Sequence, residues 1–473
     1  MKLAALRSQP GVRRLAFLAP VAARYDLPIP ADAARRGLAV GWLGLALAAL
    51  VLSGVFSLLL VAARAPFLAP LFPVADFFRV ALVVHVDLSV LVWFAACAGL
   101  MWTLNGAPRL VGLGWSALAF AAVGTALMCA APFAGRVEPV MSNYVPVLDH
   151  PLFLAGLVTF AAGAALLTLR ALAAPAPVGF ALDGADAQRF GLNAAAVSGA
   201  VAIGAFVWSW AAVPGGLPAK TYYELLFWGG GHVLQFTWTL LMIVAWLWLA
   251  TLTGLALPFG PRVAVVVFGI GLAAVFATPA IYLAWDVTAY EHRQLLTWLM
   301  RFGGGLAILP AGLALLAGLA RAPRAAGDAR PLRAALASSM LLFAVGGIIG
   351  FLIQGSDVRI PAHYHGSIVG VTLALMGLAY AALPRLGFAA PARRAATLQP
   401  ILYGGGQLLH IAGLVWSGGY GVQRKVAGAD QVLRSTGEVL GMGLMGLGGL
   451  IAIAGGVLFV VVVLRALVAR RQR

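Results

Sequence analysis

Two histidines two residues apart are the strongest chemical signal in the sequence. They lie in the segment IPAHYHGS at 360–367, which opens a long apolar run. Because an α-helix has 3.6 residues per turn, residues two apart point about 200° away from each other. His363 and His365 are therefore predicted to face opposite sides of one helix. Imidazoles that point apart suit two haem irons better than one metal ion; the alternative is a pair hydrogen-bonded to loops or headgroups at the membrane interface.

The other five histidines fall into two groups. His85, His232 and His410 lie inside apolar runs, whereas His150 and His292 lie in predicted loops. A histidine within a membrane span is a functional candidate, and a neutral imidazole bonded to a carbonyl is the alternative for each one taken singly. In the predicted topology the intramembrane histidines converge on one layer in the outer half of the membrane.

This arrangement suggests two different iron sites. One face of the helix at 361–385 and His85 would clamp one iron from both sides, as in a six-coordinate haem that only transfers electrons. The other face would give a second iron one protein ligand and leave its far position open for a small molecule. His232 is expected to face that open side, and the glycines 229–231 before it allow a flat macrocycle or another helix to approach closely.

The composition requires a membrane around these residues. Of the 473 residues 62% are hydrophobic and 10% are charged, and the mean hydropathy is +0.97. No soluble domain can bury so much apolar surface. The net charge of +17 comes from short basic clusters between apolar runs, which is typical of membrane topology and not of nucleic-acid binding. The two cysteines, Cys97 and Cys129, form no Cys-x-x-Cys-His motif, so no covalently attached haem is expected.

Twelve segments are apolar over about 20 residues, which is the length that a spanning helix needs. They predict an all-α integral membrane protein with one membrane domain at 38–467, a basic cytoplasmic arm at 1–37 and a basic cytoplasmic tail at 468–473. Lysines and arginines in alternate loops place both termini in the cytoplasm. The predicted spans are 38–63, 77–104, 110–132, 151–174, 190–213, 222–253, 262–285, 295–321, 332–355, 361–385, 398–420 and 437–467.

Taken together, these features resemble subunit I of the haem-copper oxidase superfamily, which includes the cytochrome c oxidase and nitric oxide reductase catalytic subunits. The resemblance rests on a histidine in the second span, a glycine-led histidine in the sixth and the His-x-His at the tenth, and it extends over all twelve spans. It implies a twelve-helix bundle in a bacterial inner membrane.

The resemblance also implies the cofactors, a low-spin haem b and a high-spin haem b. His85 and His365 would ligate the low-spin haem, and His363 would be the proximal ligand of the high-spin haem. His232 would be the first ligand of a second metal, which is copper in the oxidases and non-haem iron in the nitric oxide reductases.

Three further residues resemble parts of the family's site. Arg424 and Lys425, in the outer loop after the eleventh span, resemble the basic pair that holds haem propionates. A solvated basic loop is the alternative for this pair. Tyr282 resembles the tyrosine that the oxidases place near the second metal, and an ordinary interface tyrosine is the alternative.

The sequence departs from the family at the second metal. The family carries two adjacent histidines in the seventh span, and register with the Thr-Pro of the segment 278–286 puts Leu283 and Ala284 at those positions. A copper or non-haem iron needs about three protein ligands, so the second-metal site is expected to be degenerate. His410 is the best substitute ligand. The residues that could be recruited are Asp286, Glu291, His292 and His410.

The sequence therefore predicts a membrane dihaem oxidoreductase. Electrons from an outer-side donor, a periplasmic cytochrome c or a cupredoxin-like protein, would pass through the low-spin haem to the high-spin haem, where dioxygen or nitric oxide is reduced. A companion redox subunit is expected because the chain has no soluble redox domain. The alternative is a dihaem electron-transfer or gas-binding subunit that lacks the second metal and has no efficient turnover.

Overall fold

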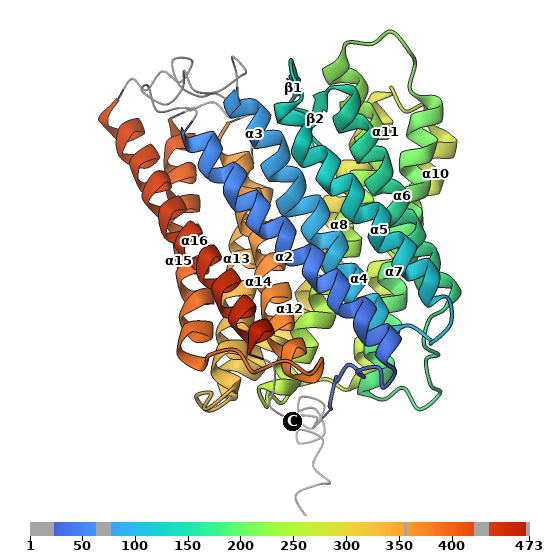
Figure 1. Cartoon of the computed structure of the whole chain (residues 1–473), viewed down its shortest axis with the longest axis vertical. Coiled ribbons are helices and arrows are strands. Elements are labelled where there is room, and N and C mark those ends of the chain that lie inside the picture. The colour runs from blue at the N-terminus through green and yellow to red at the C-terminus, as the bar shows by residue number, and fades with distance from the viewer. Residues whose placement is uncertain (1–22, 63–76, 354–356, 421–434, 470–473) are drawn as a thin grey trace, which may run out of the picture.

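Long apolar helices run side by side from one end of the molecule to the other (Figure 1). The structure is a computed structural model that describes residues 23–62, 77–353, 357–420 and 435–469. The first half of these residues forms α2 (Ala33–Ala62), α3 (Phe77–Val86), the π-helix η3 (Asp87–Val92), α4 (Trp93–Asn105), α5 (Val111–Ala130), the 3₁₀ turn η4 (Ala131–Phe133), β1 (Glu138–Val140), β2 (Val147–Asp149), α6 (Pro151–Ala173), α7 (Gly184–Ala212) and α8 (Ala219–Leu252).

All the named elements of the second half of the described residues are helices. Several helices follow one another almost without a break, so that one span is made of two or three of them. The elements are α9 (Pro261–Val275), α10 (Ala277–Ala284), α11 (Tyr290–Trp298), the π-helix η5 (Leu299–Gly303), α12 (Gly304–Arg321), α13 (Ala329–Leu352), α14 (Arg359–Arg385), α15 (Arg393–Gly419) and α16 (Thr436–Val468).

Eleven helical segments in the described ranges are long and apolar enough to cross a membrane, so the chain is a multi-pass membrane protein. They correspond to eleven of the twelve predicted spans. The remaining predicted span, 398–420, is helical as α15 but is not among the eleven. It is less apolar than the others because it contains Gln399, Gln407, His410 and the glycines 404–406.

Two helices form the centre of the bundle. In the most apolar window of α14, 89% of the residues are buried, and in that of α8 78% are buried, compared with 33% for α16. Their buried stretches, residues 240–250 of α8 and 369–383 of α14, belong to one hydrophobic core with α4. The helices that carry His232 and the His-x-His pair are therefore surrounded by protein and held in place on all sides.

Glycines set the distance between neighbouring helices. A methyl group added at Gly346 of α13 would overlap the backbone of Gly366 and Ser367 of α14. Between α15 and α16, methyl groups at Gly413 and Gly448 would overlap the facing backbone in the same way. Small residues are common where membrane helices pack, because association there depends on close van der Waals contact. The close approach of α16 helps to hold the weakly apolar α15 in the bundle.

One short hairpin lies at the end of the bundle opposite to the start of α2 and the end of α16 (Figure 1). Its strands pair antiparallel, with Val140 opposite Val147. The loop between them contains Tyr144, whose φ of 63° lies in the left-handed region that non-glycine residues rarely adopt. Such strain persists only where the surrounding structure determines the conformation of the residue.

Candidate functional site

The two histidines of α14 contact different neighbouring helices, as the helical period predicts. Nδ1 of His363 is 2.7 Å from the carbonyl oxygen of Gly346 on α13. Nδ1 of His365 is 3.1 Å from Oε1 of Gln407 on α15. Both side chains are half-buried although α14 is the most buried span. One rigid helix therefore presents an imidazole to each of two separate places in the bundle.

His85 lies at the end of α3, where the helix changes to the π-helix η3. Its Nδ1 is 2.9 Å from the carbonyl oxygen of Ser53 on α2, and 3.0 Å from the Ser53 hydroxyl. The carbonyl oxygen of His85 accepts a hydrogen bond from the Ser89 hydroxyl at 2.8 Å. π-Helical turns inside longer helices are frequent at functional sites, because the extra residue redirects side chains.

His410 of α15 lies beside His365. The two ring centroids are 4.4 Å apart with the ring planes inclined at 56°, and Nδ1 of His410 is 2.9 Å from the carbonyl oxygen of Met445 on α16. The substitute metal ligand expected from the sequence therefore lies against His365.

A common hydrogen-bonding pattern links His85, His363, His365 and His410. In each, Nδ1 is within hydrogen-bond distance of an oxygen on another helix, which acts as an acceptor for Nδ1–H. An imidazole that donates from Nδ1 carries its lone pair on Nε2, the atom that binds metal. Iron-ligating histidines are held by this second contact in most metal sites. The donor set of these four imidazoles therefore fits haem iron.

His232 of α8 has a different environment, because both of its ring nitrogens have partners. Nδ1 is 2.7 Å from the carbonyl oxygen of Trp228, one turn earlier on α8. Nε2 is 2.8 Å from the hydroxyl of Tyr144, and the two ring centroids are 4.8 Å apart. The side chain is 2% exposed. His232 therefore leaves no ring nitrogen open for a metal.

The hairpin loop is fixed against α8 by an acidic residue. Oε1 of Glu224 accepts a hydrogen bond from the backbone N–H of Asn143 at 3.1 Å, and Oε2 accepts one from the Asn143 side-chain amide at 2.9 Å. The ring of Tyr144 packs edge-on against Trp228 with centroids 5.8 Å apart. These contacts hold the residue next to Tyr144 at two points and account for the strained backbone at the tyrosine.

The glycine run before His232 accommodates aromatic rings. A methyl group at Gly231 would overlap the ring of Tyr144, and one at Gly230 would overlap the ring of Phe206. The glycines expected to admit a macrocycle or a helix thus admit side chains from the hairpin loop, α7 and, at Gly229, Tyr282 of α10. Gly231 is the reason that Tyr144 can reach His232.

Burial raises the pKa of Tyr144 well above its usual value, and the neighbouring Tyr364 and Glu224 add to the effect. A hydrogen bond with the Gln235 side chain lowers the pKa by less. The phenol therefore remains protonated at neutral pH. Because Nδ1–H of His232 donates to a carbonyl, its Nε2 is the acceptor and the Tyr144 hydroxyl is the donor.

Tyr282, the tyrosine expected from the sequence, contacts other groups. Its hydroxyl is 2.7 Å from the Ser209 hydroxyl and donates to the carbonyl of Ala205 at 3.2 Å. Its ring meets His292 edge-on with centroids 4.6 Å apart. The sequence predicted that His292 lies in a loop, and this is wrong, since His292 is part of the first turn of α11 and is 1% exposed.

Some of the residues considered for the second metal are neighbours, since His292 interacts electrostatically with both His232 and Asp286, but they do not form a group of three ligands in the described ranges. Leu283, at the first position of the missing histidine pair, is 76% exposed and points away from the bundle. The carboxylate of Asp286 accepts hydrogen bonds from the backbone N–H and the hydroxyl of Thr288. In the described ranges no three histidine, cysteine or acidic side chains form a metal-binding cluster. Within those ranges the side chains therefore do not supply the three protein ligands that a second metal needs.

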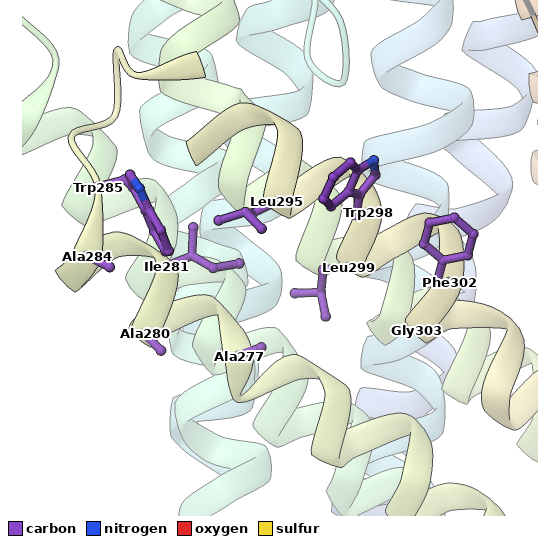
Figure 2. A pocket seen from close by; sticks show the side chains of 10 residues that line it. All are labelled: Ala277, Ala280, Ile281, Ala284, Trp285, Leu295, Trp298, Leu299, Phe302 and Gly303. Atoms are coloured by element: carbon purple, nitrogen blue, oxygen red, sulfur yellow. The ribbon is translucent and has the colours of Figure 1, made fainter. Parts of the chain in front are cut away.

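An apolar groove of 660 Å³ lies beside this region (Figure 2). Leu299 and Gly303 in its wall also pack against Phe236, one turn beyond His232. No ligating side chain lines the groove, so it is not a metal centre. The lining residues are Ala277, Ala280, Ile281, Ala284, Trp285, Leu295, Trp298, Leu299, Phe302 and Gly303.

Arg424 and Lys425 lie outside the described residues. Tyr144 was missed, because a tyrosine in a loop has no motif that connects it to a histidine 88 residues later. The glycine at 231 was the available signal, since it indicated that some group approaches the backbone next to His232.

The chain is similar in sequence to two uncharacterized bacterial proteins and similar in fold to a solved membrane protein. No family model matches the chain. An uncharacterized protein of Rickettsia prowazekii (strain Madrid E) is 29% identical over 89% of this chain and 94% of the relative. An uncharacterized protein of Aquifex aeolicus (strain VF5) is 30% identical over 73% of this chain and 85% of the relative.

Among solved structures, a heme-copper terminal oxidase dimer determined by cryo-EM aligns with a TM-score of 0.73 and 15% identity, over 93% of this chain and 85% of the oxidase chain. At this identity the likeness concerns the fold alone. The bundle that surrounds the histidines is thus a heme-copper oxidase-like fold, and the chain belongs to the same family as the Aquifex aeolicus protein.

Proposed function

We propose that the chain is a dihaem membrane oxidoreductase. A low-spin haem b would be held between His85 and His365, and a high-spin haem b would be held by His363 alone. The observation that carries the proposal is the common pattern of Nδ1 contacts, which fixes each imidazole and leaves Nε2 for iron. The oxidase-like fold supports it.

The roles of the residues follow from their surroundings. Ser53, Gly346 and Gln407 orient the three imidazoles and keep them in the tautomer that binds iron. When bound, a haem with one protein ligand supplies an open iron position at which a small gas such as dioxygen or nitric oxide binds. Arg424 and Lys425 would hold haem propionates.

We also propose the placement of the chain. α15 would be the twelfth span, both termini would be cytoplasmic and the membrane would be the bacterial inner membrane. An even number of spans agrees with α2 beginning and α16 ending at the same end of the bundle (Figure 1). Electrons would come from a periplasmic cytochrome c or a cupredoxin-like donor, with a companion redox subunit.

A second candidate function is favoured by the environment of His232. Because both of its nitrogens have partners, the chain could be a dihaem electron-transfer or gas-binding subunit without a second metal. Consumption of dioxygen or nitric oxide by the purified, reduced protein distinguishes the candidates. Sustained turnover supports the reductase, and binding without turnover supports the second candidate.

The dihaem proposal is tested by haem content and reduced-minus-oxidised spectra of the purified chain. Two haems per chain are expected. His85→Ala should remove the low-spin spectrum, and His363→Ala should remove the carbon monoxide-binding haem while the low-spin spectrum remains.

The matched control is His150→Asn, which replaces a histidine that caps α6 with another capping residue. It should retain both haems. A wild-type chain without haem, or spectra of the His85 and His363 variants identical to those of the control, contradicts the proposal.

A further inference from the structure

The contacts of His232 oppose the ligation that the oxidase fold implies. A metal bound to an imidazole nitrogen lies about 2.0–2.1 Å from it. The Tyr144 oxygen is 2.8 Å from Nε2 and the Trp228 oxygen is 2.7 Å from Nδ1. A metal on either nitrogen would overlap the oxygen that is already there, so binding would require that one of these contacts be broken.

Tyr144 is held in this position by several independent features. Its neighbour Asn143 is bonded twice to Glu224, its ring packs on Trp228, and Gly231 leaves room for the ring on α8. The backbone at Tyr144 is in the left-handed region, which is tolerated where the surroundings determine the conformation. The contact with His232 is therefore part of the packing of the hairpin loop on the bundle.

We propose that Tyr144 and His232 form a hydrogen-bonded pair in place of a second metal, and that a gas bound at the high-spin iron meets a phenol and an imidazole. This inference rests on the proposed function, because the high-spin haem on His363 supplies the gas-binding iron. The Tyr144 hydroxyl donates to Nε2 of His232, and its oxygen keeps lone pairs that can accept a hydrogen bond. The Trp228 carbonyl keeps the His232 proton on Nδ1, so that Nε2 accepts the bond from Tyr144.

The first test is the metal content of the purified holoprotein. Total iron should equal haem iron, and copper should be absent. Incubation with copper(I) or iron(II), followed by desalting, should leave less than one tenth of an equivalent bound. One equivalent of copper or non-haem iron that is lost in His232→Ala overturns the inference and leaves the dihaem proposal intact. A chain without any haem overturns the dihaem proposal instead.

The second test uses carbon monoxide as a probe of the reduced haem. Tyr144→Phe removes one hydrogen bond next to the ligand, so the rate of carbon monoxide dissociation should change by roughly fivefold and the C–O stretching frequency should shift. Gly231→Ala keeps the phenol but displaces it, because the added methyl group overlaps the Tyr144 ring. It should shift the frequency in the same way.

Two matched variants control for general effects of packing. Tyr380→Phe removes a buried phenol from α14, far along the helix from His363. The hydroxyl of Tyr380 donates to Gln399 of α15 at 3.1 Å. Gly230→Ala produces a similar overlap one residue away, against Phe206. Both should keep the wild-type carbon monoxide spectrum. An unchanged spectrum in Tyr144→Phe, or an equal shift in the two controls, overturns the role assigned to Tyr144.

Discussion

Individual histidines in this bundle differ in what their second nitrogen contacts. His85, His363 and His410 each have a backbone carbonyl beside Nδ1, which no side-chain substitution removes. His365 depends on the side chain of Gln407. The contact of His365 is therefore one that a side-chain substitution can remove.

Replacement of Gln407 by leucine should loosen the haem that His365 is proposed to hold. The Nδ1–H of His365 loses its acceptor, and removal of such outer contacts typically costs tenfold or more in metal affinity. We expect roughly tenfold faster transfer of that haem to apomyoglobin. The control is Gln399→Leu, which alters a buried glutamine bonded to Tyr380. Equal rates in the two variants would disprove the role of Gln407.

At the scale of helices, close packing of α13 on α14 decides where His363 can bond. The two helices meet at Gly346 and Gly366, and this contact brings the Gly346 carbonyl to the imidazole. Gly347, one residue later, has open space where its side chain would be. Of these two neighbouring glycines, only Gly346 has to lack a side chain, because it faces α14 and Gly347 does not.

Gly346→Ala should therefore destabilise the protein, and Gly347→Ala should not. Overpacking of a tight contact costs about 1–3 kcal/mol, whereas a substitution into open space usually changes stability by less than about 0.5 kcal/mol. Thermal unfolding in detergent measures the difference, and the high-spin spectrum reports on His363. Equal stabilities of the two variants would mean that α13 and α14 do not pack as described.

For the whole molecule, the proposed twelve spans assign each loop to one side of the membrane. Lys220, at the start of α8, would be on the outer side with the hairpin loop, and Ala326, between α12 and α13, would be on the inner side. Both residues are exposed. The hairpin loop that carries Tyr144 would then face the side from which electrons arrive.

Labelling of intact cells with a membrane-impermeant maleimide tests this orientation. Lys220→Cys should react before lysis, and Ala326→Cys should react only after lysis. The wild-type chain is the control, since Cys97 is buried and Cys129 lies within α5. Reaction of both variants, or of Ala326→Cys alone, in intact cells would refute the assignment of sides.

Much of the fold follows from the sequence because it depends on local patterns. Eleven of the twelve predicted spans coincide with apolar helices, since length and hydropathy suffice to identify a spanning helix. The divergence of His363 and His365 follows from 3.6 residues per turn and holds whatever the neighbours are. The absence of a histidine pair at 283–284 is likewise visible in the sequence.

The partners of each imidazole were decided by the tertiary structure alone. His365 bonds a residue 42 positions away and His232 bonds one 88 positions away, and no local period relates such positions. The sequence by itself determined a membrane bundle with histidines suited to haem. Only the packing of the hairpin loop on Gly231 decided that a tyrosine hydroxyl meets His232. Contacts between residues far apart in the sequence depend on how all the helices and loops pack together.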